Sequence, residues 1–159
     1  MKLVLEDGTE TVGRGFSVEA AVAGEVVFNT GMTGYVESLT DPSYRGQILM
    51  LTYPLVGNYG VPSPRRPGTL DLPYESGAIQ AQGLVVQHYV HAYSHHAGVR
   101  TLGDWLKSEG IPAISGVDTR TLTRRLRERG TMKGWLFPAE LTLAQAQQNA
   151  RAVRMEDEV

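Results

Sequence analysis

The chain has 159 residues, of which 42% are hydrophobic and 20% charged, and its formal net charge is −2. These values fit one globular domain, or one domain with a tail, and exclude a strongly basic surface for nucleic acid or anionic membranes. Cysteine is absent, which excludes disulfides, thiolate metal ligands and a cysteine nucleophile in this chain. No apolar run of about 18 residues predicts a membrane span. The first ten residues do not have the pattern of a signal peptide, so we expect a cytoplasmic protein.

Short apolar runs separated by turns predict strands in the N-terminal half. Residues 3–5 and 11–12 flank Asp7-Gly8, a dipeptide that tolerates positive φ, and this pattern predicts a β-hairpin. The run 26–28 predicts the next strand, and a glycine-containing loop follows it. Residues 48–51 are apolar without alternation, which indicates a strand buried on both faces.

The middle of the chain is less periodic. Residues 61–82 contain four prolines and predict a surface loop. A short strand is expected at 83–87, and a second loop after it. That loop holds all four histidines of the chain: His88, His91, His95 and His96. Clustered histidines can bind a transition metal, but no cysteine or nearby carboxylate completes a ligand set, so a solvent-exposed loop is the simpler interpretation.

Alternating helices and strands are predicted in the C-terminal half. A helix begins after Thr101, with Asp104 in a variant of the capping box, and ends at Gly110. Its buried face consists of Leu102, Trp105 and Leu106. A second helix, capped by Asp118 or Thr119, lies between strands at 111–115 and 132–137 and stops at Gly130. Its buried face consists of Leu122 and Leu126.

Five arginines belong to this second helix: Arg120, Arg124, Arg125, Arg127 and Arg129. A solvated helix face is the simpler interpretation, since cations are favourable near a helix C-terminus. A docking surface for an acidic partner protein is the alternative. No aromatic residues interleave the arginines, so nucleic-acid binding is not expected.

The order of elements predicts an α/β fold with a mixed sheet and helices on one side, because helix–strand alternation builds parallel strands under a helical layer.

The C-terminal tail differs in composition from the rest of the chain. Thr142 and Gln145 form a weak capping box, which predicts a short helix to about Val153 before a charged end.

The turn "TDPSY" before the strand 48–51 is a candidate binding element. Asp41 and Pro42 favour a β-turn, and Ser43 would present a hydroxyl and a backbone N–H within it. A plain turn is the simpler interpretation. No partner base can be identified from spacing. A binding role for Ser43 needs no base, so it is simpler than a nucleophilic role.

Several long segments resemble the N-terminal domain of the small subunit of glutamine-hydrolysing carbamoyl-phosphate synthase. They are "LEDGT" at 5–9, "GEVVFNTGMTGYVESLTDPSYRGQI" at 24–48, "LTYPLVGNYGV" at 51–61 and "GIPAISGVDTRTLTRRLRERGTMKG" at 110–134. The resemblance covers nearly all of 2–137 and implies a three-layer β/β/α swivelling domain. It implies domain boundaries at 1–137 for this domain and 138–159 for a short helix and the start of a linker to an absent class I amidotransferase domain.

The resemblance also implies a role in an enzyme of two subunits. The absent domain, with its Cys and His–Glu pair, would hydrolyse L-glutamine, and the large subunit would combine the ammonia with bicarbonate and ATP for arginine and pyrimidine synthesis. Ser43 carries over as a glutamine contact. No catalytic, metal or cofactor residue is expected in this chain, and ATP with a divalent metal belongs to the large subunit. The competing hypotheses are a free-standing binding module of the same fold and a hydrolase that uses Ser43 with a histidine.

Overall fold

The computed structural model describes residues 1–30, 34–52, 55–56, 61–62, 78–89 and 99–157. The strands within these ranges are β1 (Lys2–Leu5), β2 (Glu10–Val12), β3 (Arg14–Gly15), β4 (Val22–Asn29), β5 (Gln47–Leu51), β6 (Leu55–Val56), β7 (Val61–Pro62), β8 (Gly83–Val85), β9 (His88–Tyr89), β10 (Val99–Arg100), β11 (Ala113–Ser115) and β12 (Met132–Phe137). The helices are α1 (Tyr35–Thr40), the 3-10 helix η1 (Pro42–Tyr44), α2 (Leu102–Ser108), α3 (Thr119–Arg129) and α4 (Leu143–Asp157).

Eight strands form one mixed sheet in the order β2-β1-β12-β4-β5-β8-β11-β3. Neighbours from β4 to β11 pair parallel, and the remaining pairs are antiparallel. The edge strands β2 and β3 are separated in the chain by Gly13 alone, so the sheet must curl until its edges meet. Gly13 sits at this seam, where its N–H donates to the Met1 carbonyl at 3.0 Å.

The curled sheet encloses a core drawn from six of its strands. One face of β5 contributes Ile48 and Met50 to this core, and β1 contributes Leu3 and Leu5 from the opposite wall. Alternate residues of a strand point to opposite faces, so Leu49 and Leu51 lie outside the curl, under the helices. All four residues 48–51 are fully buried, which confirms the prediction of a strand covered on both faces.

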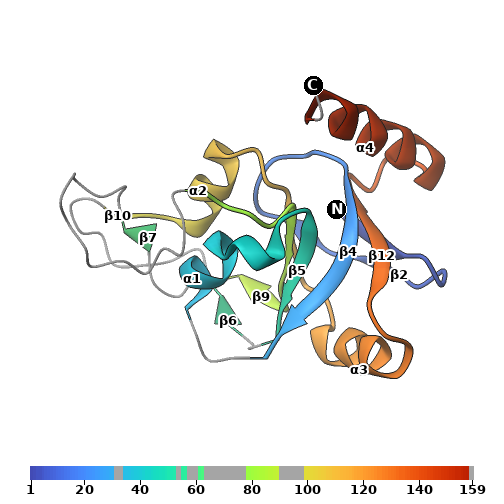
Figure 1. Cartoon of the computed structure of the whole chain (residues 1–159), viewed down its shortest axis with the longest axis horizontal. Coiled ribbons are helices and arrows are strands. Elements are labelled where there is room, and N and C mark those ends of the chain that lie inside the picture. Colours follow the sequence, from blue (N-terminus) through green and yellow to red (C-terminus); the bar gives the residue numbers. More distant parts are fainter. Residues whose placement is uncertain (31–33, 53–54, 57–60, 63–77, 90–98, 158–159) are drawn as a thin grey trace.

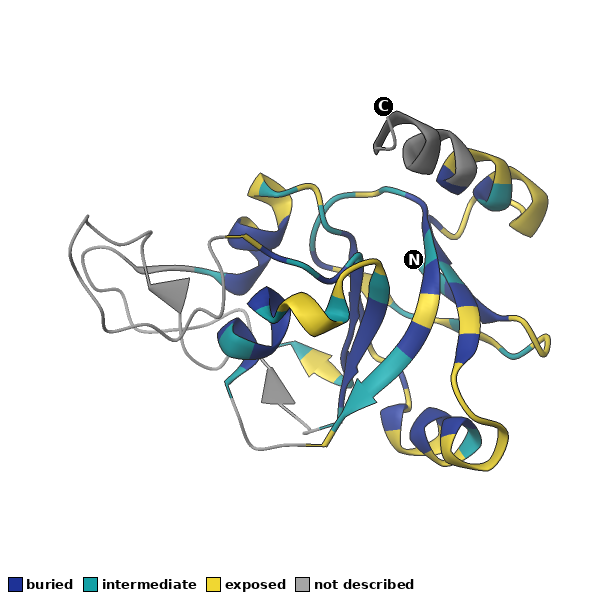
Figure 2. Ribbon diagram, in the orientation of Figure 1, coloured by how far each residue is buried: buried dark blue, intermediate teal, exposed yellow. Residues whose placement is uncertain are grey.

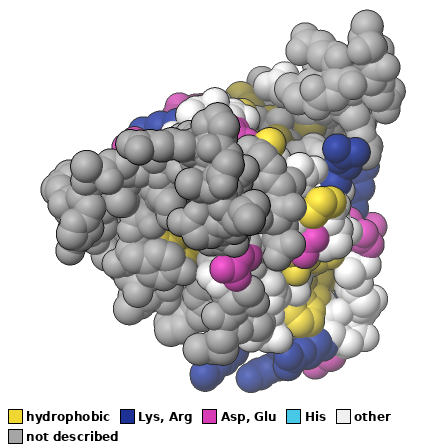
Figure 3. Space-filling view, turned by 60° about the vertical axis from the view of Figure 1, so that its left-hand side comes forward, with side chains coloured by type: hydrophobic (Ala, Val, Ile, Leu, Met, Phe, Trp, Pro, Cys, Tyr) yellow, Lys and Arg dark blue, Asp and Glu magenta, His cyan; other side chains and the backbone are white. Residues whose placement is uncertain are grey.

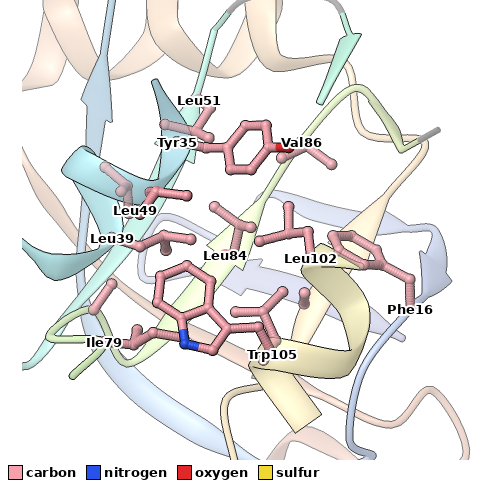
Figure 4. Close-up of a cluster of buried hydrophobic side chains, with 14 residues drawn as sticks. Phe16, Tyr35, Leu39, Leu49, Leu51, Ile79, Leu84, Val86, Leu102 and Trp105 are labelled. Carbon is pink, nitrogen blue, oxygen red and sulfur yellow. The ribbon is translucent and has the colours of Figure 1, made fainter. Parts of the chain in front are cut away.

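Helices α1 and α2 cover the outer face of the central strands (Figure 1). Tyr35 and Leu39 of α1 and Leu102 and Trp105 of α2 lie around Leu84 of β8 (Figure 4). Trp105 is 1% exposed, and burial of its large ring contributes more to this layer than any other side chain can. Figure 2 shows the buried, dark blue faces of both helices turned toward the sheet.

The two walls of the curled sheet and this helical layer make three layers, so the predicted β/β/α class and mixed sheet are confirmed. The structure differs in two respects from helices on one side only. Leu122 and Leu126 of α3 join the core inside the curl, and α3 lies at the lower end of β4 and β12 in Figure 1. Helix α4 packs Ala146 against Phe137 on the outer face of the other wall, which β1 and β12 form.

The predicted caps and turns are confirmed in detail. Gly8 has a φ of +92° in the β1–β2 hairpin. The hydroxyl oxygen of Thr101 accepts the Asp104 N–H at 3.0 Å, and Asp118 accepts the Thr121 N–H at 3.1 Å.

Other predicted elements differ from the structure. Helix α1, which follows the glycine-containing loop after β4, was not predicted. Ile79 and Ala81, inside the predicted surface loop 61–82, are buried. Residues 63–77 of that loop and Pro54 lie outside the described residues. Helix α4 has the capping box expected at Thr142 but continues beyond Val153 to Asp157.

Asp7 joins the N-terminal hairpin to α3. One carboxylate oxygen accepts the Thr9 N–H at 2.9 Å and the other accepts from the Arg125 guanidinium at 3.0 Å. The bonds to Thr9 and then the Arg125 charge lower the pKa of Asp7 from 3.8 to about 2. The stability that this shift contributes is therefore present above about pH 4 and is lost as the pH falls toward 2.

We expect Asp7→Asn to lower the free energy of unfolding at pH 7 by roughly 0.5–1 kcal/mol, since the pair lies at the surface and solvent screens it. Urea unfolding at pH 7 and at pH 3 measures the effect. The difference between the two proteins should shrink at the lower pH. A difference that is equal at both pH values would show that the Asp7 charge does not contribute.

Candidate functional site

The turn that carries Ser43 is a short 3-10 helix between α1 and β5, and it begins with the expected β-turn, in which the Tyr44 N–H donates to the Asp41 carbonyl at 3.1 Å. Asp41 is its N-cap, and a carboxylate oxygen of Asp41 accepts the Ser43 N–H at 3.0 Å. Pro42 lies at the first turn, where its fixed φ suits a helix start. Because the Ser43 N–H donates to Asp41 in this structure, we expect the hydroxyl to be the group that meets a ligand.

The hydroxyl of Ser43 remains available at the surface. Ser43 is exposed, and its side chain makes no hydrogen bond to the described residues. The Asp41 carboxylate binds the backbone of Ser43 and not its hydroxyl, and no described histidine approaches as a base. This arrangement can donate a hydrogen bond to a ligand, but it lacks the nucleophile–base contact that covalent catalysis requires.

Neighbouring side chains hold the turn in place. Tyr44 packs against the core under α1, and its hydroxyl is hydrogen-bonded to the Asn29 side chain. Asn29 in turn donates to the Ser38 hydroxyl at 3.1 Å. Burial, followed by the negative charge of Asp41, raises the pKa of the Tyr44 hydroxyl, so Tyr44 stays neutral and keeps this network at physiological pH.

The histidines do not form a metal site within the part of the chain that the structure describes. His88 is exposed on β9, and no group of three or more His, Asp or Glu side chains among the described residues could hold a metal ion. His91, His95 and His96 lie outside those residues.

Four of the five arginines of α3 have a defined place in the structure, in two sets, and Arg129 lies outside both sets. Arg125 pairs with Asp7 at 3.0 Å, which is a structural role. Three others line a hollow of about 340 Å³ between α3 and the carboxyl ends of β4 and β5. The hollow is lined by Thr30, Thr52, Arg120, Thr123, Arg124 and Arg127. The arginines could be identified from the sequence, but the threonines were missed because they come from three separate parts of the chain.

The two candidate sites lie at opposite ends of β5. Ser43 precedes the strand, whereas Thr52 follows it. Nothing in the described structure brings Ser43 together with a histidine or with the arginines, so the sites are independent. None of the helices in the described ranges combines the length and apolar character that a membrane crossing needs.

A curled mixed sheet with an outer helical layer defines a three-layer α/β domain. Comparison with known proteins gives the family. The profile of the carbamoyl-phosphate synthase small chain, CPSase domain, matches residues 3–136. The chain belongs to this family.

Individual relatives agree with the family match. "Multifunctional protein URA2" of Saccharomyces cerevisiae is 56% identical over 138 residues, which are 84% of this chain and 6% of that protein. The "Carbamoyl phosphate synthase small chain" of Sulfurisphaera tokodaii is 52% identical over 132 residues, 83% of this chain and 35% of the relative. The "Carbamoyl-phosphate synthase [ammonia], mitochondrial" of Rattus norvegicus is 50% identical over 134 residues, 83% of this chain and 9% of the relative. The chain thus spans about a third or less of each of these relatives.

Proposed function

We propose that this chain is the N-terminal domain of a carbamoyl-phosphate synthase small subunit and supports glutamine hydrolysis without catalysing it. The chemistry takes place in a class I amidotransferase domain outside residues 1–159, and the ammonia passes to a large subunit or to a fused equivalent. There it forms carbamoyl phosphate with bicarbonate and ATP, for arginine and pyrimidine synthesis. ATP and its divalent metal belong to the large subunit, and no cofactor is assigned to this chain.

The single observation that carries the proposal is the exposed Ser43 hydroxyl on a turn whose backbone N–H is already bound. Glutamine offers amide and carboxylate groups that a hydroxyl can bind. The position of α4 supports the same site. Helix α4 packs on β4 and β12, and Ala21, at the start of β4, contributes to that contact. Since β4 and β5 are parallel, α4 and Ser43 lie at the same end of the sheet, where a following domain would meet the turn.

A second function, in an enzyme that uses free ammonia, is favoured by the rat relative, whose name specifies ammonia. In such an enzyme the domain would keep its structural role and its contact with the synthase portion, and Ser43 would bind no glutamine. The two functions differ in whether substitution of Ser43 changes glutamine kinetics.

We expect the isolated chain to release no ammonia from L-glutamine, because it has no cysteine and Ser43 has no base among the described residues. The measurement is ammonia release by micromolar chain at saturating glutamine, with a boiled sample as the blank. Added large subunit should co-migrate with the chain in gel filtration. Ammonia release above the blank would contradict the proposed division of labour, whereas a failure to associate would contradict the assignment of the partner.

A further inference from the structure

The hollow beside α3 has no role in the proposed function, which places glutamine at the other end of β5. We propose that this hollow binds a phosphate group of a small-molecule ligand. Its place in the fold is suited to a ligand, because open α/β sheets bind their ligands outside the carboxyl ends of their parallel strands. Thr30 follows β4 and Thr52 follows β5 at this edge.

Positive charge gathers at the hollow. Arg124 and Arg127 form no ion pair with the described residues. Arg120 has an acidic neighbour in Asp118, but the Asp118 carboxylate already accepts from the N–H and hydroxyl of Thr121. In Figure 3, Lys and Arg side chains gather along the lower edge of the molecule, where α3 lies. The hollow therefore presents guanidinium groups that have room for an anion.

Thr123 gives an independent indication of a ligand. It is 7% exposed, lines the hollow, and its hydroxyl has no hydrogen-bond partner among the described residues. A buried hydroxyl without a partner is unfavourable, and such groups in native proteins call for an explanation. A helical threonine commonly bonds to the carbonyl four residues earlier, and Thr123 does not. The hydroxyl oxygen is itself almost completely buried, so the Thr123 side chain must rotate before it can donate to an oxyanion in the hollow.

The walls of the hollow hold these groups in position. The Arg127 guanidinium lies 5.4 Å from the centre of the Phe28 ring, a cation–π contact that fixes the long side chain beside Thr30. The hydroxyl of Thr52 donates to the Asn29 carbonyl at 3.1 Å and ties the ends of β4 and β5 together. Thr52 therefore has a structural role, because its hydroxyl is already bound. The donors left for a ligand are those of the arginines, Thr30 and Thr123.

A phosphate fits this arrangement better than a carboxylate does. The arginines come from α3 and Thr30 from the end of β4, so the donors reach the space from two sides. The oxygens of a phosphate point in four directions, whereas those of a carboxylate lie in one plane. A phosphate dianion also compensates more of the positive charge, and arginine is well suited to bind it.

The test uses inorganic phosphate as the probe and the full chain as the protein. Phosphate, titrated at constant ionic strength, should shift the amide resonances of Thr30 and Thr123 and raise the melting temperature. Arg124→Gln and Arg127→Gln should each weaken binding about tenfold, the loss expected for one charge-assisted hydrogen bond. Arg129→Gln, which removes a charge from the same helix outside the hollow, should bind as the parent does.

Thr123→Val separates binding from folding. Valine keeps the shape of threonine but has no hydroxyl, so this variant should remain folded and lose most of the phosphate-induced rise in melting temperature. Glycerol phosphate should bind at least as well as inorganic phosphate, and acetate at the same concentration should bind more weakly. The proposal is overturned if phosphate causes no shift up to about 20 mM, if acetate binds equally well, or if Arg129→Gln weakens binding as much as Arg124→Gln.

Discussion

Replacing Gly24 with alanine is expected to lower the free energy of unfolding by about 3 kcal/mol, at the upper end of the cost of overpacking. A Cβ at Gly24 would lie 2.5 Å from the carbonyl oxygen of Gly46. That oxygen is a backbone atom, so no side-chain rotation relieves the clash. Gly46 is three residues after Ser43 and has a φ of +74°, so the Ser43 turn must shift with it.

Two measurements on Gly24→Ala test this coupling between β4 and the turn. Urea unfolding gives the loss of stability, and glutamine kinetics of the complete small subunit should show a raised KM. Gly110→Ala is the control variant, because a Cβ added to Gly110 would meet no described atom within 4 Å. This variant strains the backbone, since Gly110 has a φ of +71°, but it creates no clash. It should cost about 1 kcal/mol, the effect of the left-handed backbone alone, and leave KM unchanged. Equal losses in the two variants would show that the approach of Gly24 to Gly46 is not tight.

Features that depend on a few neighbouring residues could be predicted from the sequence. Thr101, Asp118 and Thr142 cap their helices as expected, because a cap is a bond between residues two or three apart. The unbroken apolar run at 48–51 likewise indicated burial on both faces.

Helix α1 was missed because its local signals are weak. Its N-cap, Gly34, has no side chain to bond with the first turn, and six residues are too few to be stable alone. Tyr35 and Val36 are moderate helix formers at best. Both are almost completely buried against the sheet, so tertiary packing forms this helix, and no periodic pattern of that length could indicate it.

Features that join distant parts of the chain also could not be predicted from the sequence. The curl of the sheet depends on Gly13, where β2 and β3 meet, and nothing nearby distinguishes this glycine from others. The threonines of the hollow are similar, since Thr30, Thr52 and Thr123 come together only when β4, β5 and α3 assemble. At the turn, the Asp-Pro-Ser pattern indicated an exposed serine correctly, but the bond from the Ser43 N–H to Asp41 depends on a backbone conformation that the pattern did not specify.

Replacing Ser43 with alanine in the complete small subunit is expected to raise KM for glutamine about five- to tenfold and to change kcat less than twofold. The hydroxyl would contribute one hydrogen bond to glutamine, worth about 1 kcal/mol. It lies away from any described base, so the bond is made equally in the ground state and the transition state, and its loss appears in KM. Folding should be unaffected within about 0.5 kcal/mol, since the side chain is exposed.

Ser17→Ala is the matched control for Ser43→Ala, because it removes a serine hydroxyl that has a structural partner. The Ser17 hydroxyl donates to the Ile111 carbonyl at 2.6 Å. This variant should lose about 1 kcal/mol of stability with no change in KM, the reverse of the pattern at Ser43. Glutamate formation over a range of glutamine concentrations measures both constants.

An unchanged KM in Ser43→Ala, with glutaminase activity intact, would remove Ser43 from the glutamine site. If the complete subunit has no glutaminase activity at all but its synthase accepts free ammonia, the ammonia-dependent function is the correct one.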